Sequence, residues 1–290
     1  MSGKYMAYVG SYSYTGKAKG ITVFDVDVEN GMFKERCEIE VDNSSYVIAS
    51  SDGKTLYSIA DEGVVSFRIL PNGSLARLNS SSIRGMRGCH LCTDEEDKYV
   101  FVSGYHDGKT TVLNLNPDGS VGKIVDGVFD RGYGSVAERN FRPHVTCTRR
   151  MPDNRFVLSV DNGIDQVKIY RFNDKEQKLV QVDAIRCDLE SAPRHFRYSK
   201  DGKFIYLMYE LKKAIEVYTY KTGDRAPVIE KIQTISTTST KNPDNLTAAC
   251  AMRMSIDQKY IYCTNAGENT ISVYKRDEET GLLSMICCLP

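Results

Sequence analysis

The chain has 290 residues, 41% of them hydrophobic, and its 38 basic residues are balanced by 38 acidic ones. This even balance gives no electrostatic basis for binding nucleic acid or an anionic membrane. No apolar run reaches the length that crosses a bilayer, and the N-terminus has no signal-peptide pattern. We therefore expect a cytoplasmic protein with no nucleic-acid partner and no membrane partner.

Strand-forming segments follow one another along the chain, beginning with residues 5–11, YMAYVGS. Turns rich in Asp, Asn and Gly then recur at intervals of about 50 residues. Each turn leads into an aromatic and β-branched strand. These strands are 55–60, 99–104, 155–160, 204–209 and 260–265. Two insertions without helical periodicity, 126–143 and 236–249, are expected to be loops.

The repeating unit is a set of four antiparallel strands, and repeats of this kind predict the blades of an all-β propeller. The clearest copy runs from Pro193 to Ser236. We expect about six blades in a single propeller domain spanning residues 1–290. The first blade lacks its innermost strand, so the predicted ring has an open edge. Open strand edges favour self-association.

The nine cysteines are odd in number, and most fall in predicted strands. This usage is typical of free thiols that serve as small apolar residues in a reducing compartment. Cys89 and Cys92 form a CxxC pattern, but residues three apart on a strand point to opposite faces. We therefore predict no metal site and no cofactor.

Five stretches, taken in order, resemble the seven-bladed β-propeller lactonase family, which includes 6-phosphogluconolactonases and the carboxy-muconate cyclising enzymes. They are YVGSYSYTGKAKGITVFDVD, GCHLCTDEEDKYVFVSGYHDG, RPHVTCTRRMPDNRFVLSVDNGIDQVKIY, APRHFRYSKDGKFIYLMYELKKAIEVY and MRMSIDQKYIYCTNAGENTISVY. The resemblance implies that this chain lacks the final blade and closing strand of its relatives. It also implies a lactone-hydrolysing activity.

The resemblance implies a catalytic group of one His, one Glu and two Arg at the mouth of the central channel. The Arg of the Pro-Arg-His segment is Arg194 here, and the Glu of the Asn-Glu-Leu segment is Glu210. The His position holds Thr146, with His144 two residues earlier as its substitute. The second Arg should follow Asn265, where this chain has Ala266.

The internal repeat points to the same places, because equivalent positions of a propeller converge on its axis. The first residues of the five turns align as Ser51, Glu95, Pro152, Lys200 and Ile256. Six residues before each turn lie Ser45, Cys89, Thr146, Arg194 and Cys250; five before lie Tyr46, His90, Cys147, His195 and Ala251. Ten residues after each turn start lie Asp61, Tyr105, Asn162, Glu210 and Ala266, with Tyr12 as the match in the first blade.

Arg194 suits a carboxylate or phosphate, and Glu210 suits a general base acting on water. Together with His144 they form the predicted catalytic set. The predicted ligand-binding residues are His90, His195, Tyr105, Asn162, Thr146 and Asn265. An ion pair between Arg194 and Glu210 that only ties two strands together is the structural alternative. Arg149, Arg150 and the lysine pair 212–213 are expected to be solvated, and the place of Arg253 is left open.

The leading hypothesis is a metal-independent hydrolase of a small anionic sugar-acid lactone such as 6-phosphogluconolactone. The alternative is a catalytically impaired propeller that binds a small anion or a protein partner. It is suggested by Thr146 and Ala266, which cannot perform acid-base chemistry. A third interpretation, a fragment or degenerate propeller, follows from the open edge.

Overall fold

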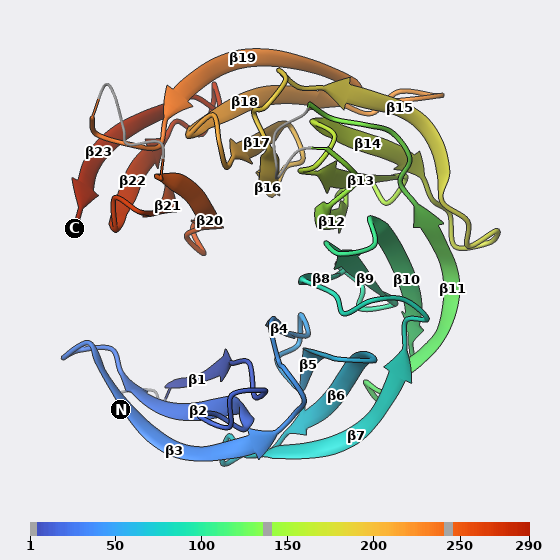
Figure 1. The fold of residues 1–290 in the computed structure, drawn as a ribbon, viewed down its shortest axis with the longest axis vertical. Helices are drawn as coiled ribbons and strands as arrows, with labels where there is room; N and C mark the ends of the chain where they lie inside the picture. Colours follow the sequence, from blue (N-terminus) through green and yellow to red (C-terminus); the bar gives the residue numbers. More distant parts are fainter. Residues whose placement is uncertain (1–4, 136–140, 241–245) are drawn as a thin grey trace. The chain divides into compact units, whose positions relative to one another are not determined.

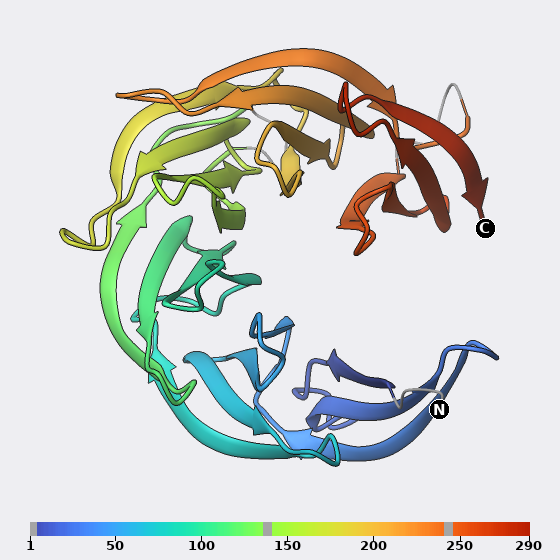
Figure 2. The ribbon, with the colours of Figure 1, turned by 180° about the vertical axis from the view of Figure 1, so that it is seen from behind.

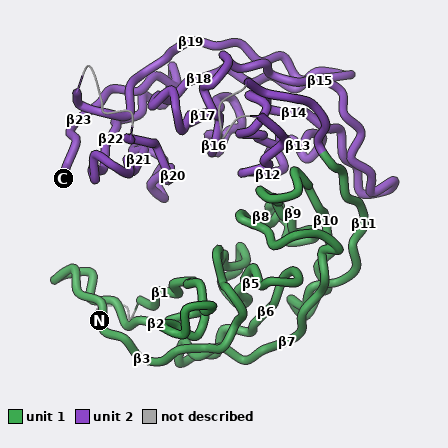
Figure 3. The backbone as a smooth tube through the Cα atoms, viewed as in Figure 1, with its two compact units in different colours: residues 1–129 green, residues 130–290 purple. Residues whose placement is uncertain are grey.

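The computed structural model describes residues 5–135, 141–240 and 246–290, and within these ranges every regular element is a strand. The chain divides into two compact units, residues 1–129 and 130–290 (Figure 3). No helix of the described residues has the length and apolar character needed to cross a membrane.

Each unit contains three antiparallel sheets, in which consecutive strands are neighbours (Figures 1 and 2). In the first unit the strands are β1 (Tyr5–Gly10), β2 (Gly20–Asp27) and β3 (Met32–Glu40); β4 (Val47–Ala49), β5 (Thr55–Ala60), β6 (Gly63–Ile69) and β7 (Leu75–Ser82); and β8 (His90–Thr93), β9 (Tyr99–Gly104), β10 (Lys109–Leu115) and β11 (Val121–Phe129). The first of these sheets has only three described strands, as the sequence predicts. Beyond its pairing with β2, β1 has no neighbouring strand among the described residues.

The second unit repeats the pattern with four strands in every sheet. Its strands are β12 (Val145–Arg150), β13 (Phe156–Asp161), β14 (Gln166–Arg171) and β15 (Val180–Arg186); β16 (Pro193–Tyr198), β17 (Phe204–Tyr209), β18 (Ala214–Lys221) and β19 (Val228–Ser236); and β20 (Ala248–Met254), β21 (Tyr260–Ala266), β22 (Thr270–Arg276) and β23 (Leu283–Leu289). Sheets of this up-and-down order are the blades of a β-propeller, which confirms the predicted fold class.

In three of the blades the second strand is buried along its whole length. All six residues of β9, β13 and β17 are buried. One apolar cluster joins the first two blades of the second unit through Phe156, Phe196 and Leu207, and another joins its last two through Tyr206, Met252 and Tyr274. The aromatic and β-branched segments that mark the repeat are therefore the core.

The turns between the first and second strands keep one backbone geometry throughout the repeat. Their third residues all have positive φ: Gly53 (68°), Asp97 (50°), Asn154 (55°), Gly202 (70°) and Gln258 (59°). A left-handed residue is tolerated best by Gly, Asn and Asp, which explains the composition of these turns. The turn positions assigned from the sequence are confirmed.

Two expectations about local structure were wrong. The segment 126–143 does not begin as a loop, because β11 continues to Phe129. This outer strand is mostly half-buried and carries two glycines, so its apolar alternation is weak. Arg150 and Lys212 are not solvated either: Arg150 is 6% exposed and binds Asp174 (2.9 Å), and Lys212 contacts the buried carboxylate of Glu216 (2.7 Å).

Candidate active site

Glu210 lies at the centre of a polar group in the second unit. One of its carboxylate oxygens, Oε2, accepts hydrogen bonds from Arg194 (2.5 Å) and from the Asn162 side chain (3.2 Å). The Glu210 side chain is 9% exposed, whereas that of Arg194 is 33% exposed. The group is therefore open to solvent on the side of the guanidinium.

The local backbone explains how Arg194 reaches this position. The pairing of β16 with β17 shifts register between Pro193 and His195, so Arg194 is the extra residue of a β-bulge. Bulges redirect a side chain and often lie beside functional sites. Glu210 follows β17 directly, and its N–H donates to the Ala192 carbonyl (2.7 Å). The end of β17 is thus fixed beside the bulge.

Neighbouring blades hold Arg194 from both sides. The Thr146 hydroxyl donates to the Arg194 carbonyl (2.8 Å), and the Arg194 Nε donates to the Cys250 carbonyl (2.9 Å). These contacts join the residues that lie six positions before the turns in three successive blades. Thr146, where the resemblance implies a His, therefore links two blades through its hydroxyl group.

His144 is buried and lies beside a second acidic group. The backbone N–H of His144 donates to the Asp161 carboxyl group (2.8 Å). The imidazole ring packs on Gly163 so closely that a Cβ atom on that glycine would lie 2.7 Å from the ring. The sequence places His144 among the catalytic residues. The structure describes it against Asp161, Gly163 and the ring of Phe141.

Asp161 is fully buried and faces Asp130. Burial raises the pKa of Asp161 to about 8, and its hydrogen bond with Asp130 and the charge of that residue add to the rise. Tyr170 (2.9 Å) and Lys168 (3.3 Å) bind the Oδ1 atom of Asp130. Burial beside a second carboxylate therefore favours the protonated form of Asp161 at neutral pH.

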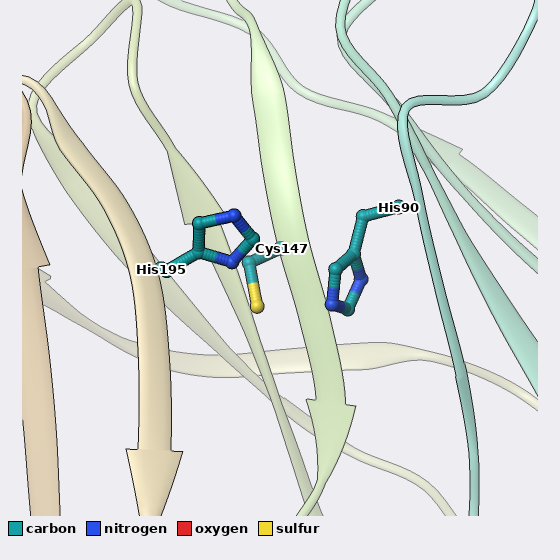
Figure 4. A group of neighbouring side chains, drawn as sticks. All are labelled: His90, Cys147 and His195. Atoms are coloured by element: carbon teal, nitrogen blue, oxygen red, sulfur yellow. The ribbon is translucent and has the colours of Figure 1, made fainter. Parts of the chain in front are cut away.

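His195 and Cys147 are neighbours on β16 and β12 (Figure 4). A ring nitrogen of His195 and the Cys147 sulfur lie within 4.8 Å of each other. The pKa of His195 is held well below its usual range, first by burial and then by Arg197 and Arg194. His195 is thus neutral at physiological pH, which excludes it as the cation of the site.

The predicted residues of the first unit form their own contacts. His90, also labelled in Figure 4, begins β8 and is fully buried, with its ring 4.9 Å from that of Tyr46. Tyr105 follows β9 and contacts the His106 ring (5.6 Å). Tyr46 and His90 each lie five positions before a turn start, as Cys147 and His195 do. In both units, therefore, residues at this repeat position in adjacent blades lie close together.

One polar group of the first unit was only partly predicted. Asp61, ten residues after its turn start, forms an ion pair with Arg87 (2.9 Å). Its two carboxylate oxygens also accept hydrogen bonds from the side-chain amide of Asn43 (3.0 and 2.9 Å). The Arg87 guanidinium also lies over the Tyr12 ring (4.9 Å). Arg87 lies outside the repeat positions that the sequence singled out, so only its basic character could have indicated it.

Asn265 is directed into its own blade. Its amide donates to the Thr237 carbonyl (2.7 Å) and to the Thr270 hydroxyl (3.1 Å), and the residue is 2% exposed. It thereby anchors the loop that begins at Thr237. The next residue, Ala266, is exposed, so its position could accommodate a long side chain.

The blades, the bulged Arg194 and its Glu210 partner define a propeller of the lactonase type. The family of seven-bladed β-propeller lactonases matches residues 6–288, and the chain belongs to this family. It is 29% identical over 289 residues to the 6-phosphogluconolactonase of Bacillus subtilis and covers 81% of that protein.

Solved structures agree with this assignment. A Bacteroides fragilis protein provisionally named 6-phosphogluconolactonase has a TM-score of 0.86 and 28% identity, over 99% of this chain and 82% of its own. The periplasmic gluconolactonase of Pseudomonas aeruginosa has a TM-score of 0.88 with 24% identity, over 98% and 82% of the two chains. The Pseudomonas aeruginosa protein shares its fold with this chain.

Proposed function

We propose that the protein hydrolyses the lactone of a sugar acid, with 6-phosphogluconolactone as the first substrate to test. The observation that carries this proposal is Glu210, whose carboxylate is bonded by both Arg194 and Asn162. Arg194 and Glu210 match the motifs that carry the resemblance to the family. The name of the Bacillus subtilis relative supports the choice of substrate.

In the proposed reaction, Glu210 accepts a proton from a water molecule whose oxygen forms a bond to the lactone carbonyl carbon. Arg194 is the partly exposed cation beside it and stabilises the negative oxygen of the tetrahedral intermediate. The ring C–O bond then breaks, and the leaving oxygen takes the proton from Glu210 to become the hydroxyl of the open-chain acid. The new carboxylic acid releases its own proton to solvent, and a guanidinium binds the resulting carboxylate well.

The experiment compares lactone opening by the wild type with the spontaneous rate. Arg194→Ala should lower the enzymatic rate to the spontaneous one, because the oxyanion loses its stabilising cation. Exposed Arg225→Ala, in the same unit, is the matched control. Equal rates for wild type and Arg194→Ala would reject the proposal.

A second candidate function is anion or protein binding without turnover. It is favoured by Thr146, which is buried and bridges two blades, and by Ala266, which has no functional group. Product binding by a protein with no measurable lactone turnover would support it, and turnover by the wild type would dismiss it.

We also propose a cytoplasmic location, supported by nine cysteines that are all free thiols in the structure. Measurement of the protein in cytoplasmic and extracellular fractions would test this.

A further inference from the structure

Three arginines occupy one repeat position in the second unit. Arg149, Arg197 and Arg253 each lie three residues before a turn start, on β12, β16 and β20, the first strands of their blades. The equivalent residues of the first unit are Ile48 and Cys92, which carry no charge. The positive charge at this position is therefore particular to three successive blades.

Hydrogen bonds hold these three strands at one level near their starts. Thr146 on β12 binds the Arg194 carbonyl of β16 (2.8 Å), and Arg194 binds the Cys250 carbonyl of β20 (2.9 Å). All three residues lie six positions before their turns. The strands therefore begin in register.

The same strands are aligned at their other ends. The Lys200 N–H donates to the Gln258 side chain (2.6 Å), which joins the turns after β16 and β20. A Cβ on Gly202 would lie 3.6 Å from Pro152, so the turns after β12 and β16 are also in contact. β16 also has Cα atoms within 8 Å of both β12 and β20. Because the three strands are aligned at both ends, Arg149, Arg197 and Arg253 lie at the same height along them.

The guanidinium groups of Arg197 and Arg253 fold back onto their own strands. β16 and β20 each pair with one neighbour, so half of their backbone groups face away from the sheet. Arg197 donates to the Phe196 carbonyl (2.9 Å) and Arg253 to the Met252 carbonyl (3.1 Å), so both adopt the same bent conformation. Arg149 and Arg197 are half-buried and Arg253 is exposed, so a ligand can reach them.

The electrostatics of His195 agree with this convergence. Apart from burial, its pKa is depressed by four arginines, namely Arg197, Arg194, Arg253 and Arg149. Coulomb interactions of this kind act only over short distances in a solvated protein. The four guanidinium groups thus generate a common positive field in the second unit.

We propose that Arg149, Arg197 and Arg253 form a phosphate-binding site. Three guanidinium groups at one level can donate several N–H bonds to the oxygens of a phosphate group, and they stay charged at every physiological pH. Three residues along a strand span about 10 Å, so the backbone of Arg197 lies further along β16 than that of Arg194. The proposal does not depend on lactone hydrolysis, because binding is measured without turnover.

The test is calorimetric titration of the whole protein with inorganic phosphate at low ionic strength. We expect binding by the wild type, and binding about tenfold weaker or more for Arg197→Gln and for Arg253→Gln, because each loses a charged hydrogen-bond donor. Exposed Arg225→Gln should bind as tightly as the wild type. Arg197→Lys, which keeps the charge but loses the fork, should fall between wild type and Arg197→Gln.

The proposal would be overturned if the wild type bound no phosphate at concentrations up to about 10 mM, which corresponds to a binding free energy weaker than about 3 kcal/mol. Equal binding by wild type and both glutamine variants would also overturn it. If thermal melting shows that Arg197→Gln is unfolded, exposed Arg253→Gln carries the comparison. Titration with 6-phosphogluconate and with gluconate then identifies the source: tighter binding of 6-phosphogluconate than of inorganic phosphate indicates a sugar phosphate, and equal binding indicates free phosphate.

Discussion

Glu210 and Arg194 form an ion pair of 2.5 Å across the β16–β17 pair, at a point where a bulge has displaced Arg194 from the regular pleat. The carboxylate is nearly buried, whereas the guanidinium is one-third exposed. The same bulge recurs at Thr146 and Cys250, so it belongs to the repeat, and only this blade places an arginine there. The arrangement keeps a carboxylate fixed beside an accessible cation, which is what the proposed lactone hydrolysis would use.

Glu210→Gln is expected to lower kcat for lactone opening by about 10²-fold or more, because the amide cannot accept the proton from water. Asn162 and Arg194 still surround the new side chain, so the melting temperature should change little. The rate is measured against the spontaneous reaction, with exposed Glu279→Gln as the control. A kcat equal to that of the wild type would show that Glu210 is not the base.

Ala266→Arg is expected to raise kcat/KM by about tenfold or more, because it places a cation where the resemblance to the family implies one. Ala266 is exposed at the end of β21, so the longer side chain meets no packing barrier. Ala266→Gln supplies a long neutral side chain as the control. The idea fails if the arginine and glutamine variants are equally active.

Asp161→Asn is expected to flatten the dependence of stability on pH. The pKa of Asp161 rises from its ordinary value of 3.8 to about 8 in the folded protein, so the folded state binds one more proton than the unfolded chain between these values. The stabilisation associated with this proton is complete below about pH 4 and is lost as the pH rises through 8. An uncharged asparagine has no proton to lose.

The measurement is the thermal unfolding of both proteins between pH 5 and pH 9. Relative to wild type, Asp161→Asn should become more stable as the pH increases, whereas exposed Asp224→Asn should follow the wild-type curve. Parallel curves for wild type and Asp161→Asn would show that Asp161 is ionised in the folded protein at neutral pH.

Glu216→Gln is expected to destabilise the protein by about 3 kcal/mol, because it removes a buried charge from a satisfied network. The Glu216 carboxylate accepts bonds from Tyr209 (2.6 Å), Lys212 (2.7 Å) and Lys231 (3.1 Å), as well as from Tyr218. Although burial works in the opposite direction, these donors lower the pKa of Glu216 to about 2. Urea unfolding measures the effect, with exposed Glu230→Gln on β19 as the control; a loss no larger than that of the control would contradict it.

Self-association through the edge of β1 is a further prediction. Beyond β2, no strand pairs with β1 in the described ranges, and Val9 on this strand is 44% exposed. We expect a concentration-dependent dimer in sedimentation velocity, and a shift toward monomer in Val9→Lys because a charge at a strand edge opposes pairing. A wild type that stays monomeric at all concentrations would rule this out.

The blades could be predicted from the amino-acid sequence. Turn residues such as Asn154 and Gly202 and the strands that follow them depend on local backbone preference and side-chain periodicity, which adjacent residues reveal. The Arg194–Glu210 pair could also be predicted, because both residues lie on adjacent strands of one hairpin. The outer strand β11 could not be predicted, because a half-buried strand lacks the regular alternation of apolar and polar residues.

The contacts between different blades could not be predicted from the sequence and are seen in the folded protein. Asn162 reaches Glu210 from another blade, Thr146 bonds to the Arg194 backbone, and burial together with Asp130 raises the pKa of Asp161. The common level of Arg149, Arg197 and Arg253 likewise depends on hydrogen bonds between blades. These relationships come from packing between residues far apart in the chain, and local sequence patterns carry no information about such distances.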